Sequence, residues 1–285
     1  MNISTINPPP QAQALLSGAQ KVSTYETTGG LVTAQFASHN LTLIPPIQDG
    51  AIIHDNACGS GTVSRLILSS PNLSSNIQIH ATDIDPPFIS ALSHAASENA
   101  WPLHATLQKS ESLSFPDSTF THSITNIGIF FTSGAGLDGA REIHRTLQPG
   151  GTVVVNCWAH VTWLVPVRAV HEHIRHGKPF PTPVVAWHDG KHIQKVMRDA
   201  GFKEEDVRVE RSDAWAVVER SGLREWAEKS WAYLGGIAGW FEGDEENWDR
   251  AVDKLVELLL VQPETVVEGD EVKMKASQWV VVAKK

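Results

Sequence analysis

A glycine-rich loop at residues 55–62, Asp-Asn-Ala-Cys-Gly-Ser-Gly-Thr, is the stretch of this chain most suited to chemistry. A dinucleotide-binding turn needs the pattern G-x-G-x-x-G, whose last glycine lets helix and strand pack closely. Here Gly59 and Gly61 are followed by Ser64 at that last position. A fixed carboxylate at Asp55 would repel a pyrophosphate, and it suits a ligand that carries positive charge. S-adenosylmethionine carries an ammonium and a sulfonium and no phosphate, and the glycines allow its close approach to the backbone.

A second carboxylate, Asp83, ends the apolar stretch 77–81 and lies 28 residues after Asp55. An acid at such a strand end can accept hydrogen bonds from both ribose hydroxyls of an adenosine, and Ile84 can pack under the adenine. A lone Asp at this position can also cap a helix, and NAD would use the same acid. The combination with the loop at Asp55 favours the ligand role.

Three stretches, in the right order and spacing over residues 51–158, carry a family resemblance. Residues 55–61 resemble motif I of class I S-adenosylmethionine-dependent methyltransferases, D-x-G-x-G-x-G, with Ala57 in place of the first glycine. Residues 113–120 resemble the family's L-P-F-x-D-x-S-F stretch, and residues 141–151 its E-x-x-R-x-L-x-P-G-G segment. The chain is most similar to the small-molecule methyltransferases of fungal secondary metabolism.

The resemblance implies S-adenosylmethionine as cofactor and S-adenosylhomocysteine as product. An N-terminal tyrosine closes over the methionine end of the cofactor in similar enzymes. The family often has an acid facing adenine where this chain has Lys109, so the backbone near Ser110 is expected to read adenine. Cys58 is expected mainly to fill the turn. The predicted cofactor-binding residues are Tyr25, Asp55, Ala57, Cys58, Gly59, Gly61, Asp83, Ile84, Ser110, Asn126 and Ile127.

The methyl acceptor is inferred from the residues after the fourth and fifth predicted strands. Residues 125–131, Thr-Asn-Ile-Gly-Ile-Phe-Phe, contain neither a carboxylate for Mg²⁺ nor the [DN]-P-P-[FYW] motif of base amino-methyltransferases. No metal is therefore expected. Phe130, Trp158 and Trp163 are predicted to bind the substrate, because ligands lie outside the carboxyl ends of parallel strands. An apolar chamber of this kind suits a hydrophobic small molecule.

A general base is harder to identify. His160 follows the fifth predicted strand and is the candidate. A thiol with a pKa of ~8.5 is partly ionised at neutral pH and can react without a general base, whereas an alcohol needs one. The predicted activity is therefore S-methylation of a reduced dithiol such as dithiogliotoxin. The alternatives are O- or N-methylation of another metabolite, or a non-methylating cyclase on the same scaffold.

A nicotinamide oxidoreductase of the short-chain type is disfavoured. That chemistry needs Tyr-x-x-x-Lys, and the two tyrosines, Tyr25 and Tyr233, are followed four residues later by Gly29 and Ile237.

Alternating strand and helix patterns between residues 51 and 158 predict an α/β fold with a doubly wound, mostly parallel, seven-stranded sheet. The remaining segments are assigned as a helical arm or lid at 1–45 and a methyltransferase domain at 46–285. Helical insertions near 159–185 and 220–262 are expected to form a lid. The predicted strands are 51–54, 77–81, 103–107, 122–125, 153–155, 207–218 and 276–283. The predicted helices are 11–16, 31–38, 62–69, 87–99, 137–147, 161–176, 191–199 and two within 222–261.

Composition limits the partners. The 285 residues include 23 Lys+Arg and 32 Asp+Glu, a net charge of −9, so an acidic chain without a basic cluster is a poor ligand for nucleic acid. No run of 18 apolar residues suggests a membrane span, and no secretory leader is visible. A cytoplasmic protein is expected, with a small-molecule substrate and no implied protein partner.

Overall fold

The computed structural model describes residues 7–71, 76–181 and 185–285. The chain divides into two compact units. Unit 1 comprises Met1–Val32, His160–Pro183 and Ala214–Ala276, and unit 2 comprises Thr33–Ala159, Val184–Asp213 and Ser277–Lys285.

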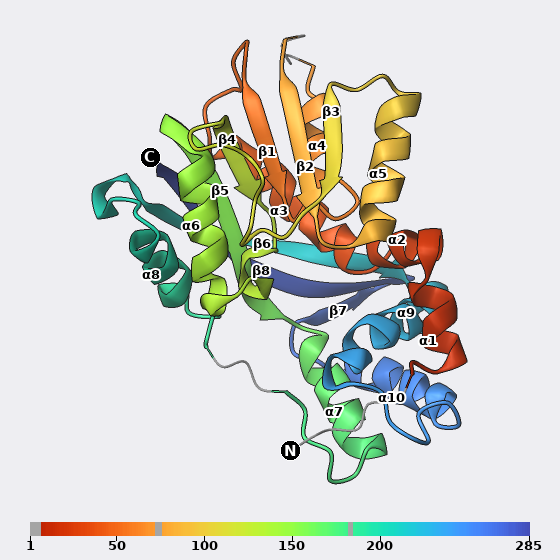
Figure 1. Cartoon of the computed structure of the whole chain (residues 1–285). Helices are drawn as coiled ribbons and strands as arrows, with labels where there is room; N and C mark the ends of the chain where they lie inside the picture. Colours follow the sequence, from red (N-terminus) through yellow and green to blue (C-terminus); the bar gives the residue numbers. More distant parts are fainter. Residues whose placement is uncertain (1–6, 72–75, 182–184) are drawn as a thin grey trace. The chain divides into compact units, whose positions relative to one another are not determined.

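The sheet has the strand order β3-β2-β1-β4-β5-β8-β6, and β7 pairs with β8. All pairings among β1 to β5 are parallel (Figure 1). The chain runs outward from β1 through β2 to β3 and then crosses to β4 on the other side of β1. This reversal of strand order is where open α/β sheets bind ligands. The strands are β1 (Ile52–Asn56), β2 (Gln78–Asp83), β3 (Leu103–Leu107), β4 (Phe120–Thr125), β5 (Leu147–Val161), β6 (Arg208–Glu219), β7 (Thr265–Glu268) and β8 (Glu271–Lys284).

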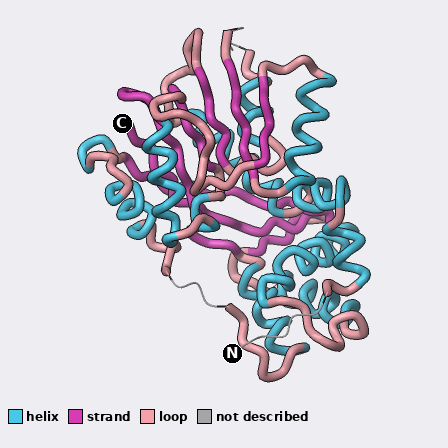
Figure 2. Tube along the Cα trace, in the orientation of Figure 1, coloured by secondary structure: helices cyan, strands magenta, loops and turns pink. Residues whose placement is uncertain are grey.

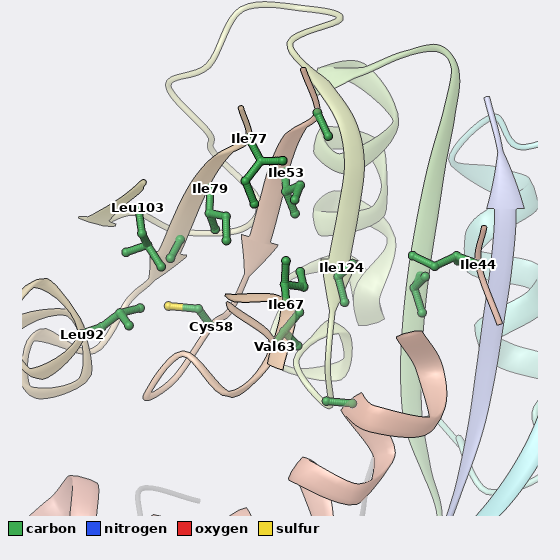
Figure 3. Packing of buried hydrophobic residues seen from close by; sticks show 14 of the residues in the cluster. Ile44, Ile53, Cys58, Val63, Ile67, Ile77, Ile79, Leu92, Leu103 and Ile124 are labelled. Atoms are coloured by element: carbon green, nitrogen blue, oxygen red, sulfur yellow. The ribbon is translucent and has the colours of Figure 1, made fainter. Parts of the chain in front are cut away.

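Unit 2 places helices on both faces of the sheet (Figure 2). One buried cluster joins β1 to β4 with α3 (Gly29–Thr42), α4 (Thr62–Leu68) and α5 (Pro86–Glu98), and Figure 3 shows its aliphatic side chains. A second cluster joins β5 and β8 with α6 (Leu137–Thr146) and α8 (Lys191–Asp199). Successive strand residues face opposite sides: Val154 enters the first cluster, and Val153 and Val155 enter the second.

Unit 1 is mainly helical. It contains α1 (Pro10–Leu16), α2 (Gly18–Glu26), α7 (Leu164–Ile174), α9 (Leu223–Gly235) and α10 (Trp248–Leu260). Its core is rich in tryptophan, and the buried ones are Trp163, Trp226, Trp231, Trp240 and Trp248. Arg175 and Asp244 form a buried two-point ion pair at 2.8 Å, with the guanidinium over the ring of Trp231. Five of the ten tryptophans in the sequence therefore pack in the core of unit 1.

The predicted doubly wound, mostly parallel sheet is confirmed, with two differences. The described part of the sheet has eight strands instead of seven, because β7 adds a short antiparallel hairpin to β8. Strand β5 begins at Leu147, the last residue of the predicted helix 137–147, so it includes the Pro149-Gly150-Gly151 stretch; it continues to Val161, so His160 lies within the strand and not after it. A register shift in the pairing of β4 with β5 accommodates that stretch within the strand. Helix α2 was not predicted.

Most of the predicted N-terminal arm and of the two predicted insertions belongs to unit 1. Unit 1 contains residues 1–32 of the arm, together with 160–183 and all of 220–262. None of the helices in the described ranges is both long and apolar enough to cross a membrane.

Candidate functional site

The loop after β1 has an unusual backbone. Ala57, Gly59 and Gly61 have φ angles of 52°, 53° and 82°. A side chain at Gly61 would put its Cβ 2.5 Å from the Leu92 side chain of α5, so the close packing there needs glycine. The Cys58 N–H donates to the carbonyl of Thr82 at 2.9 Å, and Cys58 itself is buried in the first core cluster (Figure 3). The loop is thus anchored to β2 and to the core.

Asp55 is buried at the end of β1 and holds the first turn of α4. Its Oδ2 accepts hydrogen bonds from the backbone N–H of Ser64 at 3.0 Å and from the Ser64 hydroxyl at 2.6 Å. Burial raises the pKa of Asp55 to about 7, even though both bonds from Ser64 oppose this rise. Ser64, which replaces the third glycine of a dinucleotide turn, therefore serves as the partner of this carboxylate. A cationic ligand nearby would favour the ionised carboxylate.

Asp83 connects the loop to the end of β2. One carboxylate oxygen accepts from the Gly59 N–H at 2.8 Å, and the other accepts from the Asp85 N–H at 2.9 Å. Burial raises the pKa of Asp83, and these two bonds lower it. The neighbouring Ile84 side chain is 62% exposed. A carboxylate next to an open aliphatic surface is the arrangement expected for binding an adenosine.

The turn that contains Ser110 lies beside this strand end. The N–H of Gln108 donates to the carbonyl of Asp83 at 2.9 Å, and Lys109 and Ser112 close the turn with an antiparallel bridge. Ser110, which was predicted to bind adenine through its backbone, therefore lies two residues after Gln108, which is hydrogen-bonded to Asp83.

The turn after β4 approaches the glycine-rich loop. A Cβ added to Gly128 would lie 2.6 Å from the Cβ of Ala57, so the two segments touch closely. Ile127 has a φ of 57°, and its N–H donates to Oδ1 of Asn156 at 2.6 Å. The Asn126 side chain donates to the carbonyl of Thr33 at 3.0 Å. The structure thus brings Ala57 and the predicted residues Asn126 and Ile127 together.

The other two family-like stretches contact each other. Arg145 on α6 donates to the carbonyls of Leu113 and Phe115 at 3.0 and 2.8 Å. Glu142 accepts from the N–H of Leu113 at 2.8 Å and from Arg145 at 2.7 Å. The arginine lowers the pKa of Glu142. These contacts explain the spacing of the two motifs: the charged pair on α6 fixes the chain that leads into β4.

Aromatic side chains follow the end of β4 and lie in the last part of β5 in unit 2. The Phe130 ring lies 4.3 Å from that of Phe131 and 6.1 Å from that of Trp187, measured between centroids. Phe131 is 81% exposed. Trp158 packs edge-on against Phe36 at 5.7 Å. Phe36 and Trp187 were not predicted, because nothing in their local sequence indicates that α3 and the segment before α8 reach these rings.

Three predicted residues belong to unit 1, and their roles stay predictions. The ring of Tyr25 lies 6.3 Å from that of Tyr233. His160 forms an ion pair with Glu264 and a 3.2 Å hydrogen bond with the Thr162 hydroxyl. Trp163 is buried and packs edge-on against Trp226 at 5.6 Å.

Sequence reasoning missed the residues that support the site. Asn156 directly follows three valines on β5, and Gln278 lies two residues before three valines on β8; both are buried, and this contrast with the aliphatic neighbours was the available signal. Within the described ranges, no group of three or more His, Cys, Asp or Glu side chains is arranged to hold a metal ion.

Comparison with known proteins agrees with this geometry. Residues 53–151 match the family model described as a methyltransferase domain. The acetylaranotin bis-thiomethyltransferase of Aspergillus terreus is 30% identical over 158 residues, which are 53% of this chain and 53% of that protein. The methyltransferase tpcH of Aspergillus fumigatus is 26% identical over 165 residues, 56% of this chain and 55% of that protein. The aligned region thus spans about half the length of these curated relatives.

The fold has counterparts among solved structures. The complex between the Haloferax volcanii Trm112 methyltransferase activator and a putative methyltransferase superimposes with a TM-score of 0.55 and 16% identity, over 98% of this chain and 99% of that one. The similarity supports the fold, and the sequence matches point to fungal methyltransferases. Residues 53–151 of the chain therefore match a methyltransferase domain.

Proposed function

We propose that this protein transfers a methyl group from S-adenosylmethionine to a thiol of a compact hydrophobic metabolite. The observation that carries the cofactor assignment is the pair of carboxylates at the ends of β1 and β2. Asp55 fixes α4 through Ser64, and Asp83 fixes the loop through Gly59. Asp55 lies on β1, beside the point where the strand order reverses between β1 and β4, and Asp83 ends the adjacent strand β2; this edge is where such sheets bind ligands.

The residues present fit this cofactor. Asp83 and the exposed Ile84 would hold the ribose and adenine. Ala57 and Gly59, with their left-handed backbone, leave the loop open to a close ligand. Buried Asp55 would gain from a nearby ammonium, because a positive charge favours the ionised carboxylate. The cofactor, when bound, supplies an electrophilic methyl group on a positively charged sulfur.

The chain's own contribution is alignment. Displacement at a methyl carbon needs the nucleophile, carbon and leaving sulfur in line, and water kept away from them. The turn at 126–128 and the loop at 57–61 would fix the methyl donor. Phe130 and Trp158 would form an apolar wall for the acceptor. The acceptor thiol would first lose its proton to solvent. Its thiolate would then form a new carbon–sulfur bond with the methyl carbon as the bond from that carbon to the sulfonium sulfur breaks, and S-adenosylhomocysteine would be left.

Sulfur is favoured as the acceptor for two reasons. The chain is similar to a protein named as a bis-thiomethyltransferase. A thiol, unlike an alcohol, is partly ionised near neutral pH and does not depend on a strong base. His160 and its partner Glu264 remain the candidate base, should the acceptor need one.

The test uses the full chain with S-adenosylmethionine and a reduced epidithiodioxopiperazine, alongside the matching diol. Mass spectrometry should show one or two added methyl groups on sulfur, together with S-adenosylhomocysteine. Equal methylation of the diol would move the proposal to O-methylation, and methylation of an amine-bearing metabolite instead would move it to N-methylation. A rearranged, unmethylated product with unconsumed cofactor would point to a cyclase.

A further inference from the structure

Buried side-chain amides form a continuous network in unit 2. Asn156 lies on β5, Gln278 on β8 and Asn40 on α3, and all three are buried. Polar groups in such surroundings are costly unless they are hydrogen-bonded. Aliphatic side chains at these positions would avoid the cost of removing polar groups from water. The presence of three amides therefore calls for a specific use.

The hydrogen bonds fix how Asn156 is turned. Its Oδ1 accepts from the N–H of Ile127 at 2.6 Å, and its Nδ2 donates to Oδ1 of Asn126 at 2.9 Å and to Oε1 of Gln278. The amide of Asn156 thus bonds at its oxygen and donates twice from its nitrogen. A flipped Asn156 would place a donor against the Ile127 N–H, so only one orientation satisfies the network.

Gln278 is held in turn from the opposite side. Its Nε2 donates to Oδ1 of Asn40 at 2.7 Å and to the Ser212 hydroxyl at 2.8 Å. Its Oε1 also accepts from Nδ2 of Asn40 at 3.2 Å. The orientation of Gln278, and through it that of Asn156, is therefore set by α3 and β6.

At one end of the network, Ile127 adopts a backbone conformation that is unfavourable for isoleucine. Ile127 has a φ of 57°, and β-branched residues rarely adopt the left-handed region. Such backbone strain persists only where the surroundings impose it, and it concentrates at functional sites. The next residue, Gly128, abuts Ala57 of the glycine-rich loop. A relaxed Ile127 would therefore move the turn that faces the proposed methyl donor.

We propose that Asn156 and Gln278 are positioning residues, which hold the turn at 126–128 in the geometry that methyl transfer needs. This inference rests on the proposed methyltransferase function. Asp83 and Ile84, which would hold the adenosine, lie outside the network. Loss of the network should therefore lower turnover more than cofactor affinity.

The test compares Asn156→Leu and Gln278→Leu with Val281→Ala. Val281 is a buried residue on β8 that belongs to the second core cluster and makes no contact in the network's hydrogen bonds. Native-state hydrogen exchange of the Ile127 N–H should become about tenfold faster in Asn156→Leu, as expected for one lost hydrogen bond. Turnover should fall by about tenfold to 100-fold, the effect of a misplaced reacting group. Binding of S-adenosylhomocysteine, measured by calorimetry, should weaken by a smaller factor than turnover, because Asp83 and Ile84 lie outside the network.

Gln278→Glu keeps the oxygen that accepts from Asn156 but loses the two hydrogen bonds that Nε2 donates to Asn40 and Ser212. It should lower turnover as Gln278→Leu does, because the orientation of the side chain is no longer held by α3 and β6. Unchanged hydrogen exchange at the Ile127 N–H in Asn156→Leu would overturn the inference. This measurement needs no methyl acceptor, so its outcome does not depend on whether the proposed function is correct. Faster exchange with full turnover would also overturn it, as would an equal loss of turnover in Val281→Ala.

Discussion

The backbone N–H of Gly59 donates to a carboxylate oxygen of Asp83 at 2.8 Å, which joins the glycine-rich loop to the end of the neighbouring strand. The same carboxylate also accepts from the Asp85 N–H. A bound ribose would add two hydroxyl donors to an acceptor that is already oriented by the backbone. The position of Asp83 is thus fixed before the ligand arrives, which limits the entropy lost on binding.

Replacing Asp83 should therefore weaken cofactor binding. Asp83→Ala removes the acceptor for both ribose hydroxyls and should cost about 1–3 kcal/mol of binding free energy for S-adenosylhomocysteine. Isothermal titration calorimetry measures this directly. Glu98→Ala, which removes an exposed acid from α5, is the charge-matched control and should bind like the wild type. Tight binding of NADH in place of S-adenosylhomocysteine would contradict the assignment.

The raised pKa of Asp55 predicts two pH effects. In the free protein the pKa of Asp55 is about 7, against an ordinary value of 3.8, so the folded state binds a proton that the unfolded chain has already lost. This contribution to stability is complete below pH ~3.8 and is lost as the pH rises through 7. Because a cationic cofactor favours the ionised form, affinity should rise with pH up to about 7.

Asp55→Asn separates these effects. It should flatten the loss of stability between about pH 4 and 7 in chemical denaturation, and it should bind S-adenosylmethionine more weakly at pH 8. Ser64→Ala, which removes one hydrogen bond to the carboxylate and leaves its charge, is the companion variant. A pH dependence of affinity that is the same in Asp55→Asn and in the wild type would show that another group titrates.

His54 gives the opposite pH dependence. It is buried between β2 and β4, is stacked on Phe120 at 4.6 Å and hydrogen-bonds with the Thr82 hydroxyl at 2.9 Å. Burial lowers its pKa to about 3, from 6.5. The unfolded chain therefore binds a proton that the folded chain rejects, so stability is lost as the pH falls from ~6.5 towards 3.

The change should amount to at most about 2 kcal/mol between pH 6.5 and 5, since one pH unit corresponds to ~1.4 kcal/mol for each differential proton. His54→Gln, which keeps a polar group near Thr82, should reduce this slope in urea denaturation series. His94→Gln, at an exposed site on α5, should leave it unchanged. An unaltered slope in His54→Gln would assign the acid sensitivity to other groups. His80 is one such group, because its ring contacts the same Phe120 ring and burial also lowers its pKa.

The sequence was most informative where local pattern and chemistry coincide. The parallel strands around Asp55 and Asp83 were predicted because each is a short apolar stretch that ends in a charged or glycine-rich turn. The left-handed backbone of Gly59 and Gly61 follows from the absence of a side chain. The same conformation at Ile127 could not be predicted, because it depends on a hydrogen bond to Asn156, 29 residues away.

Long-range pairing also limited the prediction of the fold. Strand β7 is only four residues long and exists through its hairpin with β8. The start of β5 at Leu147 depends on pairing with Phe120 and overrides the Pro-Gly-Gly sequence that favours a turn. Trp163 illustrates the same limit for side chains, since its burial against Trp226 depends on the packing of α7 with α9 and has no local signal.

The identity of the acceptor is tested most directly by the pH dependence of turnover and by His160. If sulfur accepts the methyl group, the rate should rise with pH up to the thiol pKa of the substrate, about 8.5, because the thiolate is the nucleophile. His160→Ala should then lower turnover by well under the ~100-fold expected for a lost general base. His173→Ala, an exposed histidine at the end of α7, is the control for a generic loss of imidazole. Steady-state kinetics with a dithiol and its diol analogue, at several pH values, measure all of these effects. A collapse of activity in His160→Ala with an unchanged melting temperature would show that the imidazole, paired with Glu264, removes a proton from a poorly acidic hydroxyl, and the acceptor would then be oxygen.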